Sequence, residues 1–290
     1  MPDIAYVNGR WSALEEAVIS INDRGFLFGD GVYEVVRVYD GRMFRPDLHL
    51  ARLARSASHI ALDLPLTRED FLTLFEEALR RSGQREAIIY LQVTRGVAPR
   101  SHAIPPDLTP SVIVTVRPAP VVTDAVRAAG VAVVTVPDVR WLRCDIKTTA
   151  MMGNVLALLA TNRAGGFEGI QVRDGLVTEG ISTNLFAVFD GVVQTAPEGT
   201  ALLSGVTRHL VAELARAHPG LREESVSATD LVQADEVFLT STTKEVVSVV
   251  SVDGERIGDG RPGPVAADLH TRLRQQIAEA CGLASVGARA

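Results

Sequence analysis

The stretch PAPVVTDA, residues 118–125, decides how the fold is divided. It follows a β-branched run and carries two prolines, which lack the backbone N–H that a central strand needs. We therefore expect a linker at 118–125, with an N-terminal α/β domain at 1–117 and a C-terminal domain at 126–290. A chain of 290 residues is long enough to bury a core in each part.

Turn signals and hydrophobic periodicity predict the elements of the N-terminal part. Asp47, after Pro46, is expected to cap the first helix, and Thr67 with Asp70 the second. The β-branched runs before the linker are typical of buried strands. In order, the sequence predicts a short strand turning at Asn8-Gly9, a hairpin turning at Asp40-Gly41, helices at 47–62 and 67–83, and strands at 86–96 and 111–118.

The C-terminal part is dominated by strands, with helices between them. Its hairpins are expected to turn at Asp174-Gly175 and Asp190-Gly191, because alternating apolar residues flank both pairs. The predicted order is a strand at 130–137, a helix at 151–166, hairpins at 169–180 and 184–196, a helix at 204–218 opened by Ser204 and Gly205, two strands within 235–257, and a helix at 267–282. The chain as a whole is therefore expected to be α+β or α/β.

The composition argues against several classes of function. The net charge is −6, and basic residues form no stripe of the kind that binds nucleic acid. No apolar run approaches the roughly 20 residues of a membrane helix, and the N-terminus lacks the apolar core of a signal peptide. The two cysteines and six histidines show neither CxxC nor HExxH spacing. We expect a cytoplasmic protein that binds no nucleic acid, membrane or metal.

Lysine is rare in this chain. Lys147 and Lys244 are the only two, so arginine supplies 27 of the 29 basic residues. Arginine stays protonated in proteins and cannot act as an amine nucleophile. Lys147, in WLRCDIKTT (141–149), lies between a predicted strand and a predicted helix, where a neutral amine could form a Schiff base. A surface lysine on a loop is the alternative. Lys244 follows TSTT, and we expect it to face solvent without a role.

Three further segments carry groups that suit a phosphorylated heteroaromatic cofactor. Glu179, at a hairpin end, could hold a ring nitrogen protonated, as pyridoxal phosphate requires. The helix start SGVTRHLV (204–211) offers free backbone N–H groups and the Thr207 hydroxyl to a phosphate. TSTT (240–243) offers more hydroxyls at a strand end, and Arg52 offers a countercharge. Each feature also fits an ordinary helix cap or a solvated residue.

The loop TRGVAPRSH (94–102) places Arg100 and His102 two positions apart. In an extended segment such side chains point the same way, and together they would form a cationic clamp for a carboxylate. A solvated basic loop is the alternative. GDG (29–31) and AGGFEG (164–169) do not match GxGxxG after a strand, which argues against a dinucleotide site.

Six segments are distinctive: DRGFLFGDGVYEVVRVYDG (23–41), QVTRGVAPRSH (92–102), RWLRCDIK (140–147), VTEGISTNLF (177–186), SGVTR (204–208) and FLTSTT (238–243). Taken together, they resemble the class IV (fold type IV) aminotransferases that use pyridoxal phosphate, and within them the D-amino acid aminotransferases. The resemblance implies a two-domain fold type IV enzyme, a cofactor-binding C-terminal domain and a homodimer. It also implies ping-pong transfer of an amino group from D-amino acids such as D-alanine or D-glutamate to 2-oxoglutarate or pyruvate. The resemblance runs over nearly the whole chain.

The resemblance further implies roles for individual residues. Lys147 would be the Schiff-base lysine and would shuttle the substrate proton, and Glu179 would pair with the pyridine nitrogen. Tyr33, Arg100 and His102 would bind the substrate carboxylate, the last two from the partner subunit. The remaining cofactor-binding positions would be Arg52, Val206, Thr207, Ser241 and Thr242 at the phosphate, and Leu203 against the ring.

Alternatives on the same scaffold stay open: a branched-chain L-amino acid or (R)-amine transaminase, or an aminodeoxychorismate-type lyase that releases pyruvate. The branched-chain enzymes and the lyases lack the Arg-x-His clamp, and the former usually carry GTA where this chain has STT (241–243). Ile181 and the segment TTAMMGN (148–154) depart from the D-amino acid pattern, which leaves substrate preference open. A non-catalytic cofactor-binding protein is the alternative of another class, although it would not need both Lys147 and Glu179.

Overall fold

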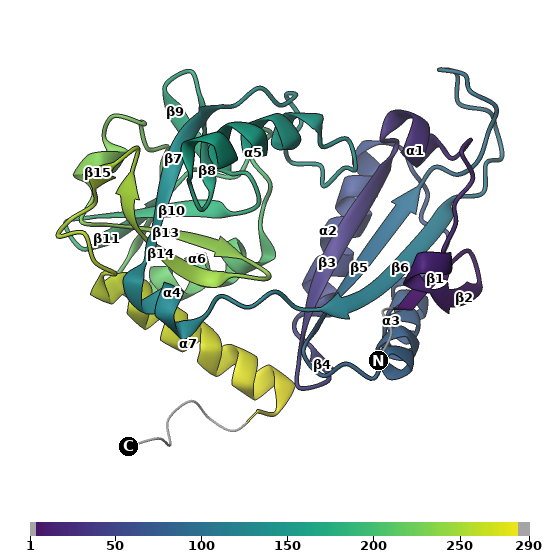
Figure 1. Cartoon of the computed structure of the whole chain (residues 1–290), viewed down its shortest axis with the longest axis horizontal. Coiled ribbons are helices and arrows are strands. Elements are labelled where there is room, and N and C mark those ends of the chain that lie inside the picture. The colour runs from purple at the N-terminus through teal and green to yellow at the C-terminus, as the bar shows by residue number, and fades with distance from the viewer. Residues whose placement is uncertain (1–3, 284–290) are drawn as a thin grey trace. The chain divides into compact units, whose positions relative to one another are not determined.

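The computed structural model describes residues 4–283 and divides into two compact units. Of these residues, the first unit comprises 4–119, 146–151 and 280–283, and the second comprises 120–145 and 152–279. The unit boundary at residue 119 lies within the proline-bearing stretch 118–125. The segment that carries Lys147 belongs to the first unit although it lies far along the chain. Figure 1 labels most of the helices and strands of both units.

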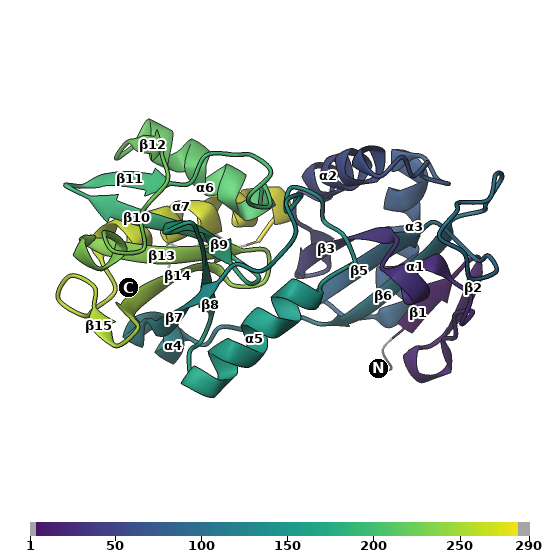
Figure 2. The same cartoon turned by 90° about the horizontal axis from the view of Figure 1, so that it is seen from above.

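The first unit is an antiparallel six-stranded sheet in the order β2-β1-β6-β5-β3-β4. Two helices, α2 and α3, pack on one face of it (Figure 2). The elements are β1 (Ile4–Val7), β2 (Arg10–Ala13), η1 (Leu14–Glu16), α1 (Arg24–Phe28), β3 (Gly31–Tyr39), β4 (Arg42–Met43), α2 (Pro46–His59), α3 (Arg68–Ser82), β5 (Ala87–Thr94) and β6 (Ser111–Pro118).

The alternation of β3 separates two groups of side chains. Val32, Val36 and Val38 join Leu50 and Leu53 of α2 in one apolar core. Because strand side chains alternate, residue 34 shares this helix-covered face while residue 33 lies on the other. The β-branched runs had suggested strands that are buried on both faces. In the structure, only one face of this sheet is covered. Burial alternates along β5, which is typical of an antiparallel sheet with one covered face.

Of the two helix caps predicted for this unit, the cap of α3 is confirmed and the cap of α2 is not. Thr67 and Asp70 form the predicted capping box at the start of α3. The prediction that Asp47 caps α2 is wrong. The cap residue is Arg45, with φ 49°, and Pro46 begins the helix, so Asp47 lies inside the first turn. A proline at the first helical position moves the start two residues earlier than the leucine spacing suggested.

The second unit contains a nine-stranded sheet in the order β12-β11-β10-β13-β14-β7-β8-β9, with β15 paired to β14. The elements are α4 (Asp124–Ala129), β7 (Val131–Pro137), α5 (Met152–Ala164), β8 (Gly169–Arg173), β9 (Leu176–Gly180), β10 (Asn184–Phe189), β11 (Val192–Thr195), α6 (Val206–Ala217), β12 (Leu221–Glu223), η2 (Leu231–Gln233), β13 (Glu236–Ser241), β14 (Glu245–Val252), β15 (Glu255–Arg256) and α7 (Pro264–Cys281).

The hairpins of this unit turn where the sequence predicted, at Asp174-Gly175 and Asp190-Gly191, and both residues of each pair have positive φ. The position of β7 was not predictable in the same way. It pairs in parallel with β8 and with β14, and α5 packs on β7 and β8 (Figure 1). None of the helices in the range 4–283 is long and apolar enough to cross a membrane.

Candidate functional site

Lys147 and Tyr33, two of the predicted site residues, lie together in the first unit. The backbone of the lysine pairs with β3, since Tyr33 N donates to Lys147 O at 3.0 Å. The lysine N–H donates to Ser56 Oγ of α2 at 3.1 Å. Its Nζ lies 4.3 Å from the centre of the Tyr33 ring, within the range of a cation–π contact. The amine is therefore placed beside a phenol on the sheet face that α2 does not cover.

Arg52 is buried on the other face of β3, where it makes a two-pronged ion pair with Glu34. The Nε–Oε1 distance is 2.7 Å and the Nη2–Oε2 distance is 2.8 Å. His49 Nδ1 lies 2.8 Å from the same carboxylate. Burial would raise the pKa of Glu34, but the Arg52 charge and the hydrogen bonds of Arg52 and His49 hold it far below its usual range. Glu34 thus fixes the orientation of the Arg52 guanidinium.

Glu34 and His49 were not predicted from the sequence. A signal for Glu34 was nonetheless present, because it occupies the 32-34-36-38 face of a strand whose other members are valines. A charged residue at such a position needs a buried partner of opposite charge.

Arg100 and His102 lie in a loop that bends at both positions, so the expected extended segment is wrong. The two side chains nevertheless meet at one aromatic ring of α1. Arg100 Cζ lies 5.6 Å from the centre of the Phe28 ring, and the His102 ring lies 5.7 Å from it. The loop is anchored by Arg24, whose Nη1 donates to Ser101 O at 2.8 Å. The pair converges because of a shared ring rather than because of strand alternation.

Glu179 is buried at the end of β9 in the second unit. Its Oε2 accepts a hydrogen bond from Asn184 Nδ2 at 3.1 Å, and its Oε1 accepts from the backbone N–H of Leu203 at 3.1 Å. Arg140 completes the set with an ion pair to Oε1. The predicted solvated alternative for Glu179 is wrong, because the carboxylate has three different donors in a buried position.

Arg140 itself is held by a second carboxylate. Its Nε and Nη2 both lie 2.9 Å from the oxygens of Asp138, and Arg173 Nη2 lies 3.0 Å from the same group. Burial would raise the pKa of Asp138, but the hydrogen bonds and charges of the two arginines lower it. The Arg140 pKa is raised: burial opposes the charged form, but Asp138 and Glu179 outweigh it. Arg140 is the first residue of the motif at 140–147, but nothing in the sequence pattern assigned a role to it.

The N-terminus of α6 has two features that suit an anion. The cap residue is Gly205, which makes no side-chain cap hydrogen bond, and the first turn carries no acidic residue. The predicted cofactor residues Val206 and Thr207 form this first turn, and both are buried. A Cβ at Gly205 would lie 2.1 Å from Asn184 Oδ1, so any other residue would force one of the two to move. Free N–H groups at such a terminus are suited to bind phosphate.

Ser241 ends β13, and Thr242 begins the turn that leads to β14. Ser241 Oγ accepts from the backbone N–H of Lys244 at 3.1 Å. The expectation that Lys244 faces solvent is wrong. Its Nζ donates to Glu168 Oε2 at 2.9 Å and to Ser182 Oγ at 2.7 Å, and the side chain is 22% exposed.

The two departures from the D-amino acid pattern are in contact. Asn154, at the end of the segment 148–154, donates from Nδ2 to the Ile181 carbonyl at 3.0 Å. A Cβ at Gly169 would lie 2.8 Å from Ile181 Cδ1, which places this side chain against the start of β8. Both positions belong to the second unit, near the end of β9.

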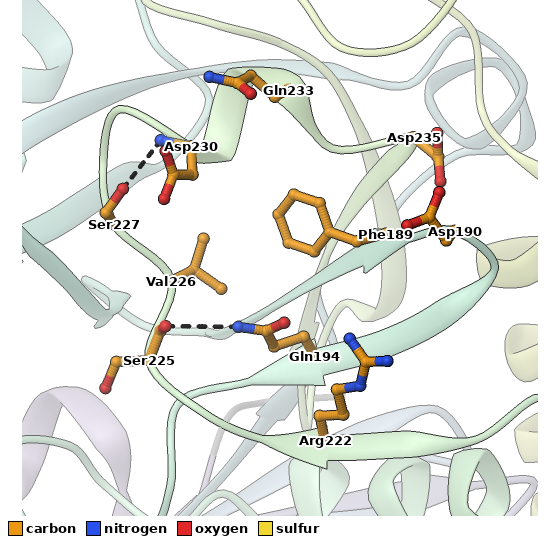
Figure 3. A pocket seen from close by; sticks show the side chains of 10 residues that line it. All are labelled: Phe189, Asp190, Gln194, Arg222, Ser225, Val226, Ser227, Asp230, Gln233 and Asp235. Carbon is orange, nitrogen blue, oxygen red and sulfur yellow. Dashed lines mark hydrogen bonds between the residues drawn. The ribbon is translucent and has the colours of Figure 1, made fainter.

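A separate pocket of about 440 Å³ opens in the second unit, beside the turn of the β10–β11 hairpin (Figure 3). Phe189 lies at its centre, with Arg222 on one side and Ser227 and Asp230 on another. None of the predicted site residues lines it. Among residues 4–283, no cluster of His, Cys, Asp and Glu has the arrangement of a metal site.

The comparison with known families decides the assignment. The family model described as amino-transferase class IV matches residues 31–252 of this chain. The chain is a class IV aminotransferase. This class IV aminotransferase is 42% identical to the D-alanine aminotransferase of Bacillus licheniformis over 272 residues, which covers 93% of this chain and 95% of that protein. The predicted family and enzyme class are thus confirmed.

Solved structures agree with the fold type. This class IV aminotransferase matches the branched-chain amino acid aminotransferase of the archaeon Thermoproteus uzoniensis, solved with norvaline, with a TM-score of 0.86 and 27% identity over 96% of this chain and 95% of that one. It also matches the 4-amino-4-deoxychorismate lyase of Pseudomonas aeruginosa, with a TM-score of 0.82 and 27% identity over 93% and 98% of the two chains.

The chemistry of the donor set fits pyridoxal phosphate. A carbonyl needs an amine, a pyridine nitrogen needs a carboxylate, and a phosphate needs hydroxyls and free N–H groups. The class IV aminotransferase presents Lys147 in its first unit, and in its second unit a buried Glu179 and the start of α6 at Gly205. Asn184 connects Glu179 to the segment just before α6, because its Nδ2 donates both to Glu179 Oε2 and to Leu203 O at 2.9 Å.

Proposed function

We propose that this protein is a pyridoxal-phosphate-dependent D-amino acid aminotransferase, which exchanges the amino group between D-amino acids and 2-oxo acids. One observation carries the choice of substrate class. Identity to the D-alanine aminotransferase of Bacillus licheniformis is 42% over 93% of the chain, against 27% for both the branched-chain enzyme and the lyase. D-alanine or D-glutamate would be the donor, and pyruvate or 2-oxoglutarate the acceptor.

Lys147 is the catalytic residue of this proposal. Its amine would hold the cofactor carbonyl and would move the proton of the substrate α-carbon. The second lysine cannot substitute for it, because Lys244 Nζ is bound to Glu168 and Ser182. When bound, pyridoxal phosphate supplies the electron sink that stabilises the α-carbanion.

Glu179 is proposed to hold the pyridine nitrogen protonated. The carboxylate is oriented for this by Arg140, Asn184 and the Leu203 N–H, so it has little freedom to turn away from a ligand. Leu203 is proposed to pack on the ring. The phosphate is assigned to the first turn of α6, with Val206 N–H and Thr207, and to Ser241, Thr242 and Arg52.

Tyr33, Arg100 and His102 are proposed to bind the substrate carboxylate, the last two reaching the site of the partner subunit. A homodimer is therefore part of the proposal. The exposed face of α5 supports it, because apolar side chains about half exposed in one chain are suited to an interface. These side chains are Met152, Val155, Leu156, Leu158 and Leu159. A cytoplasmic location is also proposed, and it is supported by the low cysteine content, two in 290 residues, which suits a reducing compartment.

The absorbance of the purified enzyme tests the substrate class. The cofactor bound to a lysine is expected to absorb at about 410–420 nm. D-alanine is expected to remove this band and L-leucine to leave it unchanged. If L-leucine alone removes the band, the branched-chain function replaces the one proposed here. Pyruvate release from aminodeoxychorismate would instead indicate the lyase.

The two lysines offer an internal control for the attachment site. Reduction with borohydride fixes the cofactor on its lysine, and peptide mapping then identifies that lysine. The label is expected on the peptide that contains Lys147. A label on Lys244 would refute the assignment.

The carboxylate clamp is tested by Arg100→Ala. We expect KM for the D-amino acid to rise about tenfold or more while the cofactor absorbance is unchanged, since a charged hydrogen bond to substrate is lost. Kinetics identical to those of the wild type would rule out this role for Arg100.

A further inference from the structure

Lys244 forms a bridge between two segments that carry proposed cofactor residues. Its backbone belongs to the turn of Ser241 and Thr242, and its N–H is tied to Ser241 Oγ at 3.1 Å. Its side chain reaches the segment after Glu179, where Nζ donates to Ser182 Oγ at 2.7 Å. A single residue therefore connects the phosphate turn to the segment that follows the pyridine partner.

The bridge also balances a buried charge. The Glu168 side chain is 5% exposed, and its oxygens accept from Ser182 N at 3.1 Å and Ser182 Oγ at 3.0 Å. Lys244 Nζ, 2.9 Å from Oε2, supplies the opposite charge. A buried carboxylate without this partner would be strongly unfavourable and would repel any nearby anion.

The backbone at both ends of the bridge is held in place. Arg127 Nη2 donates to Lys244 O at 3.0 Å. On the other side, Gly180 N donates to Thr183 O at 2.8 Å, which closes the turn that contains Ser182. The lysine side chain therefore connects two ordered turns. Its loss would change both the distance between these turns and the net charge beside Glu168.

We propose that Lys244 is a positioning residue for the cofactor phosphate. Its ammonium neutralises Glu168 close to the turn that carries Ser241 and Thr242. Its hydrogen bond to Ser182 fixes the position of that turn relative to the segment that follows Glu179. The inference rests on the proposed function, which assigns Ser241 and Thr242 to the phosphate. The positive charge reduces the repulsion between Glu168 and the phosphate dianion, so it favours pyridoxal phosphate over unphosphorylated pyridoxal.

The test measures cofactor affinity in the apoenzyme rather than activity. Absorbance titrations give the Kd of pyridoxal phosphate and of pyridoxal for the wild type, Lys244→Met, Lys244→Arg, Glu168→Gln and the double variant Lys244→Met/Glu168→Gln. Lys244→Met keeps the length of the side chain but removes its charge. Unfolding temperatures of the apoenzymes report any general loss of structure.

Lys244→Met is expected to weaken binding of pyridoxal phosphate about tenfold, the scale of a hydrogen-bonded charge pair, and binding of pyridoxal less than about threefold. Lys244→Arg is expected to restore the affinity for pyridoxal phosphate. The double variant is expected to recover most of it, because no uncompensated carboxylate remains.

If Lys244→Met weakened the binding of both ligands equally, the role of Lys244 would be merely structural and the inference would be overturned. An unchanged Kd for pyridoxal phosphate in Lys244→Met would overturn it too. If the double variant bound pyridoxal phosphate as weakly as Lys244→Met does, the charge argument would be refuted. If the wild type bound neither ligand, the proposed function itself would fail, which distinguishes the two ideas.

Discussion

Asn184 and Glu179 are joined by a hydrogen bond of 3.1 Å from Nδ2 to Oε2. The bond spans the turn between β9 and β10 and therefore sets where the carboxylate lies. The same amide donates to Leu203 O at 2.9 Å, and its Oδ1 occupies the space beside Gly205. One asparagine thus positions both the proposed partner of the pyridine nitrogen and the start of the proposed phosphate helix.

Glu179→Gln tests the carboxylate at the centre of this arrangement. The amide keeps the shape but cannot hold a pyridine nitrogen protonated, so we expect kcat for D-alanine to fall about 100-fold or more. The free energy of unfolding should fall by roughly 1–3 kcal/mol, because Arg140 loses one of its two carboxylate partners. Steady-state kinetics and chemical denaturation measure the two effects.

Glu236→Gln is the matched control for that variant. Glu236 is also buried, and it accepts from the N–H groups of Val265 and Ala266 at 2.9 Å each, at the start of α7. We expect a similar loss of stability with kcat within about twofold of the wild type. If the two variants had equal activity, the role assigned to Glu179 would be untenable.

Gly205→Ala tests the helix start. The added Cβ would lie 2.1 Å from Asn184 Oδ1, so the first turn of α6 or the asparagine must move. We expect the affinity for pyridoxal phosphate to fall about tenfold or more, through misplaced N–H donors. Gly199→Ala, in the preceding loop, is the control, because a Cβ there has no neighbour within 4 Å. Equal affinity of the two variants would contradict the phosphate assignment.

Arg24→Lys tests how the Arg100 loop is held. Arg24 Nε binds Asp30 at 2.8 Å while its Nη1 donates to Ser101 O at 2.8 Å, and lysine cannot make both contacts in this forked geometry. We expect KM for D-alanine to rise roughly three- to tenfold with unchanged affinity for cofactor. A change in cofactor affinity instead of KM would show that α1 supports a different part of the site.

Glu245 predicts a specific acid sensitivity. Burial would raise its pKa, but the His270 hydrogen bond and the charges of Arg274 and Arg127 lower it from an ordinary value near 4.5 to about 2. A carboxyl whose folded-state pKa is depressed stabilises the fold fully above the unfolded value and loses this contribution as the pH falls. The loss should amount to roughly 3 kcal/mol between about pH 4.5 and 2.

The unfolding free energy of the wild type and of Glu245→Gln, measured across this pH range, checks the prediction. We expect the variant to be less stable at pH 7 and to have a flatter pH profile. His270→Leu, which removes the imidazole that lies 2.8 Å from Glu245 Oε2, should give an intermediate slope. Parallel profiles for all three proteins would refute the assignment of the acid sensitivity to Glu245.

The sequence by itself determined the local elements of this protein and its family. The Asp-Gly pairs at 40–41, 174–175 and 190–191 predicted hairpins because both residues of each pair take positive φ, which few residue pairs tolerate. The capping box of Thr67 and Asp70 predicted the start of α3. These features depend on neighbours a few positions away, so a sequence can specify them without knowledge of the fold.

Only the tertiary structure decided which distant groups meet. β7 lies between β8 and β14 in parallel, Glu34 meets Arg52 across the strand and helix, and Lys244 meets Glu168 rather than water. Arg140, 39 positions before Glu179, had no pattern linking it to that carboxylate. Buried charges find partners through packing, because the free energy of desolvation is offset only where an opposite charge lies within hydrogen-bond distance, and that proximity depends on the whole fold.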